Sequence, residues 1–251
     1  MSGSAAPEGP KYDATDAVTW YISVRPPTGK SDEWLSHEYR VVHAAMTKGV
    51  ADHTDALQAY TQVELLKPKD TKNAENPDWR YLTCLKWQSL MAVWAGLQTE
   101  GYKRTAGAHV FASPDHEGCL AKEVVRYPSG EEVHTAIRGV LFHRRQTSSD
   151  EASEEWIQDQ AQKAKMVLEP ESTLKSYALS VDMTPKDVDY YFAGSQFSTG
   201  DWLQFKAVEV LGFDDEDAAQ DFLTKHLDAY RQENANGPLP VVVMGKATKV
   251  V

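Results

Sequence analysis

The sequence has little of several features that mark common protein classes. It has only two cysteines in 251 residues, Cys84 and Cys119, which are too few for a disulfide framework and typical of reduced thiols. Its longest apolar stretches, such as residues 239–245, are far too short to span a bilayer. Residues 1–10 are small and polar, without the basic and apolar regions of a signal peptide. These absences predict a soluble, cytoplasmic protein.

Basic side chains and cofactor motifs are also scarce. The 26 Lys and Arg face 37 Asp and Glu, for a net charge of −11, and a chain this acidic repels a phosphate backbone. We therefore expect neither nucleic acid nor membrane as a partner. There is no Walker loop, GxGxxG, GxSxG, HExxH or CxxC motif. His109 and His116 flank Asp115 in an irregular segment, but without such a motif no metal site is predicted.

What the sequence does contain is a repetition. Residues 31–33, 57–61 and 78–79 recur, in the same order, at 149–151, 174–178 and 201–202. The copies lie about 118 residues apart, and each occupies the same place in a strand–helix pattern, which indicates a duplicated unit. A Pro-Ser-Gly break at 128–130 separates the halves. The sequence predicts a disordered tail at 1–15, one unit at 16–130 and another at 131–251.

Hydrophobic periodicity predicts the same six elements in each half. In the first half they are strand 18–24, helix 31–49, strand 57–66, strand 79–87, helix 89–99 and strand 119–127. In the second they are strand 137–144, helix 150–167, strand 174–183, strand 202–211, helix 214–231 and strand 239–244. The order β-α-β-β-α-β is that of a ferredoxin-like domain. Because its helices cover only one face of the sheet, we predict two tandem α+β repeats whose sheets meet in one closed barrel.

The two faces of the first strand differ in character. Its apolar face, expected to lie against the helices, consists of Val18, Trp20, Ile22 and Val24. The mixed face, expected to look into the barrel with polar residues of the next strand, consists of Tyr21, Ser23, Arg25, Gln58, Tyr60 and Gln62. Buried polar groups are costly without water or a ligand, so this face predicts a wet pocket. His143 is expected to reach the same cavity. The alternative is an ordinary solvated sheet face, with Arg25 a rim charge.

The stretch 20–27, followed by 31–38 and 39–46, resembles an EthD-type domain of the dimeric α/β-barrel superfamily. The family pattern is a strand, a Pro/Gly break and a helix in which an aromatic residue precedes a His by four positions. Tyr39 and His43 match that pair, whereas the second half has Gln160 and Ala161 at the corresponding positions. The resemblance implies a barrel that acts without metal or organic cofactor, with the helix His facing the cavity as acid or base.

Tyr39 and His43 are the predicted catalytic residues. At i and i+4 they share a helix face, and an imidazole beside a phenol can transfer protons near neutral pH. His43 is expected to be the acid or base and Tyr39 its orienting partner. The predicted substrate-binding residues are Tyr21, Ser23, Arg25, Gln58, Tyr60 and His143. The opposing interpretation is a structural His beside an apolar stripe. Trp79, Trp87, Trp94 and Trp202 are interpreted mainly as core.

Together with the resemblance, these patterns predict a cofactor-free lyase or isomerase of secondary metabolism. Its expected substrate is an aromatic or polyketide-like small molecule, handled by a cyclase, dehydratase, decarboxylase or isomerase reaction, in a monomer or homodimer. Two alternatives are a non-catalytic binding or stress-related barrel and a haem-binding or cofactor-free oxygenase barrel.

Overall fold

The computed structural model describes residues 12–51, 54–66, 73–105, 110–130, 132–167 and 173–251. Its strands are β1 (Val18–Val24), β2 (Leu57–Leu66), β3 (Tyr81–Trp87), β4 (Gly118–Tyr127), β5 (Ile137–Arg144), β6 (Leu174–Asp182), β7 (Phe205–Phe213) and β8 (Val241–Lys249). Its helices are α1 (Asp32–His37), the π-helical segment η1 (Glu38–His43), α2 (Ala44–Ala51), α3 (Leu90–Gln98), α4 (Glu100–Arg104), α5 (Glu154–Val167), α6 (Val188–Tyr191) and α7 (Glu216–Glu233).

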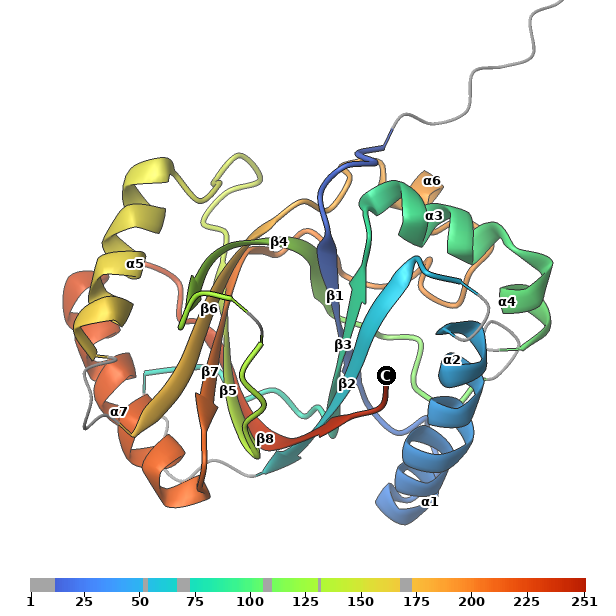
Figure 1. The fold of residues 1–251 in the computed structure, drawn as a ribbon, viewed down its shortest axis with the longest axis horizontal. Coiled ribbons are helices and arrows are strands. Elements are labelled where there is room, and N and C mark those ends of the chain that lie inside the picture. Colours follow the sequence, from blue (N-terminus) through green and yellow to red (C-terminus); the bar gives the residue numbers. More distant parts are fainter. Residues whose placement is uncertain (1–11, 52–53, 67–72, 106–109, 131, 168–172) are drawn as a thin grey trace, which may run out of the picture.

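The eight strands close into a single antiparallel barrel in the order β1-β3-β2-β8-β5-β7-β6-β4. Figure 1 shows α1 to α4 on one flank of this barrel and α5 and α7 on the other. The predicted closed α+β barrel is thus confirmed, and the predicted strands and helices are present with ends shifted by a few residues. None of the described helices is long and apolar enough to cross a membrane.

The two halves have matching sheet topology. The strands β4-β1-β3-β2 of the first half follow the same order as β8-β5-β7-β6 of the second, and the halves join at β2/β8 and β4/β6. Each half also has a β-bulge at the corresponding place in its sheet. The β2–β3 register shifts between Leu57 and Ala59, and the β6–β7 register shifts between Leu174 and Ser176. The sequence match between 57–61 and 174–178 therefore coincides with a shared backbone feature.

Side chains alternate between the barrel interior and the helix layers. One end of the interior is filled by apolar and aromatic side chains, including Tyr21, Trp79, Phe142 and Phe205. Trp20 and Trp202 lie on the helix side of the first half, where their ring centroids are 5.7 Å apart. Trp87 belongs to the same cluster and Trp94 packs at its edge, so the interpretation of the tryptophans as core is confirmed.

The predicted faces are correct for β1 and wrong for β2. Val18, Trp20, Ile22 and Val24 face the helices, as expected. On β2, however, Ala59 and Thr61 line the interior, whereas the Gln62 amide donates to the main-chain carbonyl of Tyr39 in the helix layer. Tyr60 lies on that same outer side, and Gln58 is exposed at the bulge. The polar face of β2 looks outward because the helix layer itself supplies polar partners, such as the Tyr39 carbonyl.

His143 was also predicted on the wrong face. Its ring lies 5.1 Å from that of Trp156 on α5 and 5.3 Å from that of Tyr230 on α7, so it belongs to the helix layer. Leu141, Tyr177 and Leu179 pack in the same layer. The physical reason is register, because a shift of one residue in aligning β5 with β1 moves every side chain to the opposite face.

The predicted disordered tail extends too far along the chain. Residues 1–11 lie outside the described part, but the Tyr12 ring packs edge-on against Tyr191 with centroids 4.7 Å apart. The Tyr12 hydroxyl donates to Asp187 at 3.1 Å. Tyr12 therefore belongs to the folded unit and covers the layer beside α3 and α6.

Gly118, at the start of β4, allows a close backbone approach to β1. A Cβ there would lie 1.9 Å from the Tyr21 carbonyl oxygen, which is main chain and has little freedom to move. We expect Gly118→Ala to lower the free energy of unfolding by about 3 kcal/mol in a denaturant titration. Gly29→Ala is the control, because Gly29 has φ +79° but nothing within 4 Å of its Cβ, and it should lose only about 1 kcal/mol. Equal losses would show that the close approach is unimportant.

Candidate functional site

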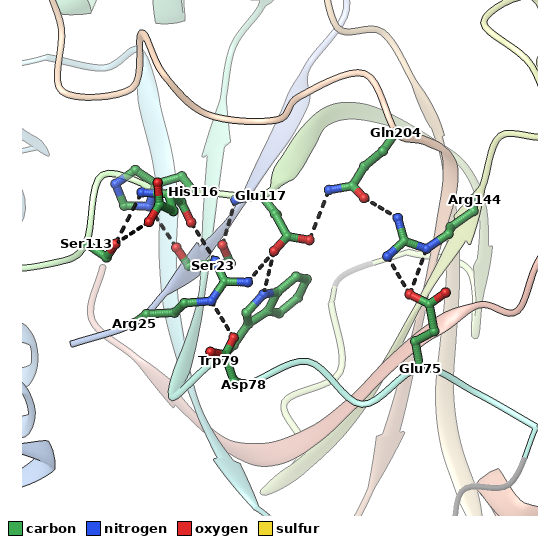
Figure 2. Close-up of polar contacts among 11 residues, drawn as sticks. Ser23, Arg25, Glu75, Asp78, Trp79, Ser113, His116, Glu117, Arg144 and Gln204 are labelled. Atoms are coloured by element: carbon green, nitrogen blue, oxygen red, sulfur yellow. Dashed lines mark hydrogen bonds and ion pairs between the residues drawn. The ribbon is translucent and has the colours of Figure 1, made fainter. Parts of the chain in front are cut away.

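A polar network covers the filled end of the barrel, and it contains two predicted substrate-binding residues. Figure 2 shows it running from Arg25 through Glu117 and Gln204 to Arg144 and Glu75. Arg25 also bonds Asp78 at 2.5 Å and the Asp115 carbonyl. Ser23 accepts from the Glu117 amide at 2.7 Å. Arg25 and Ser23 therefore bond other protein groups at the filled end of the barrel, where they belong to this network.

Tyr39 and His43 lie on η1, a segment in which the helix departs locally from α-helical geometry. The helix begins at Ser31, whose hydroxyl accepts from the Trp34 amide, and it widens to π-helical geometry over Glu38–His43 before resuming in α2. Gln62 of β2 donates to the Tyr39 carbonyl at 2.9 Å within this segment. Such π-helical segments occur often at functional sites. The two rings are nearly parallel, at 13°, with centroids 6.1 Å apart.

Two buried tyrosines, Tyr39 and Tyr60, form a hydrogen-bonded set with their partners beside His43. The Tyr39 hydroxyl shares a 2.5 Å hydrogen bond with Thr83 of β3, and the Gln62 amide donates to the Tyr60 hydroxyl at 2.7 Å. Burial raises the pKa of Tyr39 well above its ordinary value and also raises that of Tyr60. Both phenols therefore stay protonated at neutral pH and can act as hydrogen-bond donors.

His43 is the half-exposed member of this group. Its Nε2 lies 3.4 Å from the Thr47 hydroxyl one turn further along, and its ring centroid lies 4.1 Å from that of Phe111. The imidazole thus sits between the buried phenols and the molecular surface. We call this group the η1 cluster, which consists of Tyr39, His43, Tyr60, Gln62 and Thr83.

The η1 cluster lies outside the barrel wall, which corrects the prediction that His43 faces the barrel cavity. Tyr39 bonds Thr83, whereas the next residue, Cys84, lines the interior on the opposite face of β3. The structure therefore brings together three residues that the sequence singled out for the site, Tyr39, His43 and Tyr60. It separates them from Tyr21, which lines the interior, and from Gln58, Ser23, Arg25 and His143.

The second half has a different polar group in the equivalent layer. Glu209 of β7 pairs with Leu141 as Thr83 of β3 pairs with Ile22, so Glu209 holds the position of Thr83. Its carboxylate is 2.6 Å from His143 Nε2 and 3.3 Å from His226 Nε2 of α7. The sequence reasoning missed Glu209 and His226, although an acidic residue inside the apolar pattern of residues 205–213 was a visible signal.

These contacts set the charge state of the buried Glu209. Burial alone would raise its pKa, but the hydrogen bond with His143 and the ion pair with His226 lower it well below the ordinary range. Burial likewise opposes the charged form of His226, yet Glu209 raises the pKa of that imidazole. The adjoining cavity, beside Tyr177 and Gln160, measures about 30 Å³, room for about one water molecule. This layer, as packed, does not fit a haem.

The barrel interior holds a larger cavity, of about 280 Å³, at the end opposite the polar network. Tyr21 and Cys84 lie among its lining residues, and the charged side chains that line it are Asp16, Lys86, Lys122, Glu123, Arg126, Glu132 and Arg138. An interior pocket, as expected from the sequence, is thus present, but Tyr21 is the only one of the six predicted substrate-binding residues that lines it. Alternation along β3 could have indicated Lys86, because it shares a face with Cys84.

No three potential metal ligands gather among the described residues. His116 of the candidate loop is buried, with its Nδ1 2.9 Å from the Ser23 carbonyl, and burial lowers its pKa. His109 lies outside the described residues.

The barrel with helices on both flanks defines a fold class, that of the dimeric α/β-barrel proteins. A chlorite dismutase from Candidatus Nitrospira defluvii, in an arginine-to-alanine variant, superposes with a TM-score of 0.54 at 10% identity, over 95% of this chain and 93% of that one. Another variant of that enzyme, in complex with cyanide, gives 0.53 at 12% identity, with the same coverage. At such low identity these likenesses show the fold alone.

Sequence comparison is more specific. Chalcone isomerase cfoK of Aspergillus candidus is 32% identical over 238 residues, which cover 89% of this chain and 92% of that protein. The chain therefore belongs to the family of this chalcone isomerase. No family model matches the chain, so the EthD-type resemblance stays a hypothesis.

The paired charges of Glu209 and His226 predict a pH-dependent stability. The lowered pKa of Glu209 stabilises the fold above its unfolded value of 4.5, and this contribution is lost as pH falls through the folded pKa. The raised pKa of His226 stabilises the fold below 6.5, and this contribution is lost as pH rises through the folded pKa. We expect Glu209→Gln to lower the free energy of unfolding by about 3 kcal/mol at pH 6, and by less above pH 8. A pH-independent difference between the wild type and the variant in urea unfolding would contradict this.

Proposed function

We propose that this protein is a cofactor-independent isomerase that closes a ring in a phenolic, polyketide-like small molecule, with the η1 cluster as its catalytic site. The reaction class is supported by the relative named chalcone isomerase, at 32% identity over most of both chains. The site rests on one observation above all: a half-exposed imidazole stacks beside a set of buried, protonated phenols.

The chemistry of such a ring closure sets what a site must supply. In a chalcone with a phenol beside its carbonyl, the phenol oxygen loses its proton and adds to the β-carbon of the enone. A C–O bond forms, the carbon–carbon double bond becomes an enolate, and the α-carbon then takes up one proton. Atoms and charge balance without an oxidant or reductant. The site needs a base near neutral pH and hydrogen-bond donors for the enolate oxygen.

The residues of the η1 cluster match these needs. His43 is the group that takes the phenol proton and returns one to the α-carbon, since an imidazole can act both as a base and, once protonated, as an acid. Tyr39 positions the imidazole by ring contact and is itself held by Thr83. Tyr60, fixed by Gln62, is the donor toward the developing enolate. Gln58, Ser23, Arg25 and His143 are not assigned to this site.

We further infer that the chain is a tandem of two ferredoxin-like units in which only the first carries the catalytic pair. The matching strand order and the shared bulge support this. The Tyr39–His43 pair that carries the EthD-type resemblance lies in the proposed site. Since one chain completes the barrel, a monomer is sufficient for activity.

The decisive experiment compares two histidines of one helical segment. With a 2′-hydroxychalcone as substrate, we expect His43→Gln to lower kcat/KM by about 10²-fold or more, because the base is lost. His37→Gln is the matched control, because His37 is exposed, and it should keep wild-type activity. Ring closure is followed by loss of the absorbance of the conjugated enone.

Tyr39→Phe keeps the ring but removes its bond to Thr83. It should lower activity less than His43→Gln does. Unfolding midpoints of all three variants show whether each is folded. Wild-type activity in folded His43→Gln would remove the η1 cluster from the mechanism, and no turnover of any hydroxychalcone by the wild-type protein would overturn the reaction class.

A further inference from the structure

We propose that the cavity inside the barrel is a second ligand site, separate from the η1 cluster, that binds a small organic monoanion: an aromatic ring bearing one carboxylate. Its volume of about 280 Å³ is near the lower end for small-molecule sites. Aromatic side chains fill the opposite end of the barrel, so the cavity is closed at that end, and Asp16 and Thr19 are among its lining residues.

The cavity is lined by one more basic side chain than acidic side chains. Three of the four basic side chains that line it are paired with carboxylates, as Lys122 with Asp16, Arg126 with Glu123 and Arg138 with Glu132. Lys86 is the fourth, and among the described residues no carboxylate lies within ion-pair distance of it. An ammonium in a partly enclosed space is stabilised by a counter-ion, so the cavity favours a ligand with one negative charge.

The remaining lining provides space and polar groups for a ring. Ala59, Ala178 and Val210 offer small apolar surfaces. Gly212 keeps the space open, since a Cβ there would lie 2.2 Å from the Ser176 hydroxyl and 2.7 Å from that of Thr135. The Thr135 hydroxyl is buried and has no hydrogen-bond partner among the described residues. A buried hydroxyl without a partner is costly, and a polar substituent on the ring can supply one.

The cavity and the η1 cluster lie on opposite faces of one strand. Cys84 and Lys86 point into the barrel, whereas Thr83 bonds Tyr39 outside it. The wall of hydrogen-bonded strands β1, β3 and β2 separates them. One small molecule cannot contact both, so a ligand in the barrel is an addition to the proposed catalytic site.

Calorimetric titration of the full chain with 4-hydroxybenzoate tests the proposal. We expect binding of one equivalent to the wild type and at least about 10-fold weaker binding to Lys86→Met, the change that loss of one charge-assisted contact produces. Lys48→Met is the matched control, because Lys48 is exposed on α2, and it should bind as the wild type does. The neutral 4-hydroxybenzamide should bind the wild type more weakly than 4-hydroxybenzoate does. It should bind the wild type and Lys86→Met with equal affinity.

His43→Gln separates this proposal from the proposed function. We expect it to bind 4-hydroxybenzoate normally even where its isomerase activity is lost. Three outcomes would overturn the second site: no binding to the wild type at millimolar acid, equal affinity in Lys86→Met, or loss of binding in His43→Gln but not in Lys86→Met. Loss of isomerase activity in folded Lys86→Met with full activity in His43→Gln would make the barrel cavity the catalytic site and overturn both assignments.

Discussion

The structure depends on the closure of eight antiparallel strands into one barrel within one chain. Closure removes every sheet edge and leaves each strand residue two destinations, the interior or a helix layer. Because successive residues of a strand point to opposite faces, the position of a residue along its strand decides which of the two environments its side chain enters. Thr83 and Cys84 are neighbours in sequence, yet one bonds Tyr39 under η1 and the other lines the interior. A register error of one residue would exchange the contents of the two environments.

Several charged groups are buried by this closure, and each is placed so that partners surround it. Arg145 and Asp182, whose side chains are 6% and 3% exposed, bond each other at 2.5 Å. Arg25 and Glu117 lie within a network across the filled end of the barrel. Removing one partner of such a pair leaves a buried charge without a counter-ion. This lowers the free energy of unfolding by about 3–5 kcal/mol, even where the intact pair adds little net stability. The loss of one partner therefore costs more than the intact pair contributes.

Sequence periodicity predicted the strands, the helices, the closed barrel and the proximity of Tyr39 and His43, because these follow from local spacing. It failed for the faces of Tyr60, Gln62 and His143, because polarity was taken to mean the interior. In this fold both the interior and the helix layers are polar in places, so polarity does not identify a face. Lys86 and Glu209 stand out in the patterns of their own strands, but the groups that surround each of them are distant in sequence, and no local pattern contains those groups.

Matching positions in the two halves differ in chemistry, although the strand order and the bulges of the halves agree. Tyr60 and Tyr177 follow the same bulge, but Thr83 is matched by Glu209. A neutral hydroxyl at that position shares a hydrogen bond with the buried phenol of Tyr39. In the second half, the Glu209 carboxylate at that position pairs with the imidazoles of His143 and His226. The charge of Glu209 raises the pKa of the His226 imidazole and so favours its charged form. The same fold position therefore holds a neutral hydroxyl pair in the first half and a buried carboxylate–imidazole set in the second.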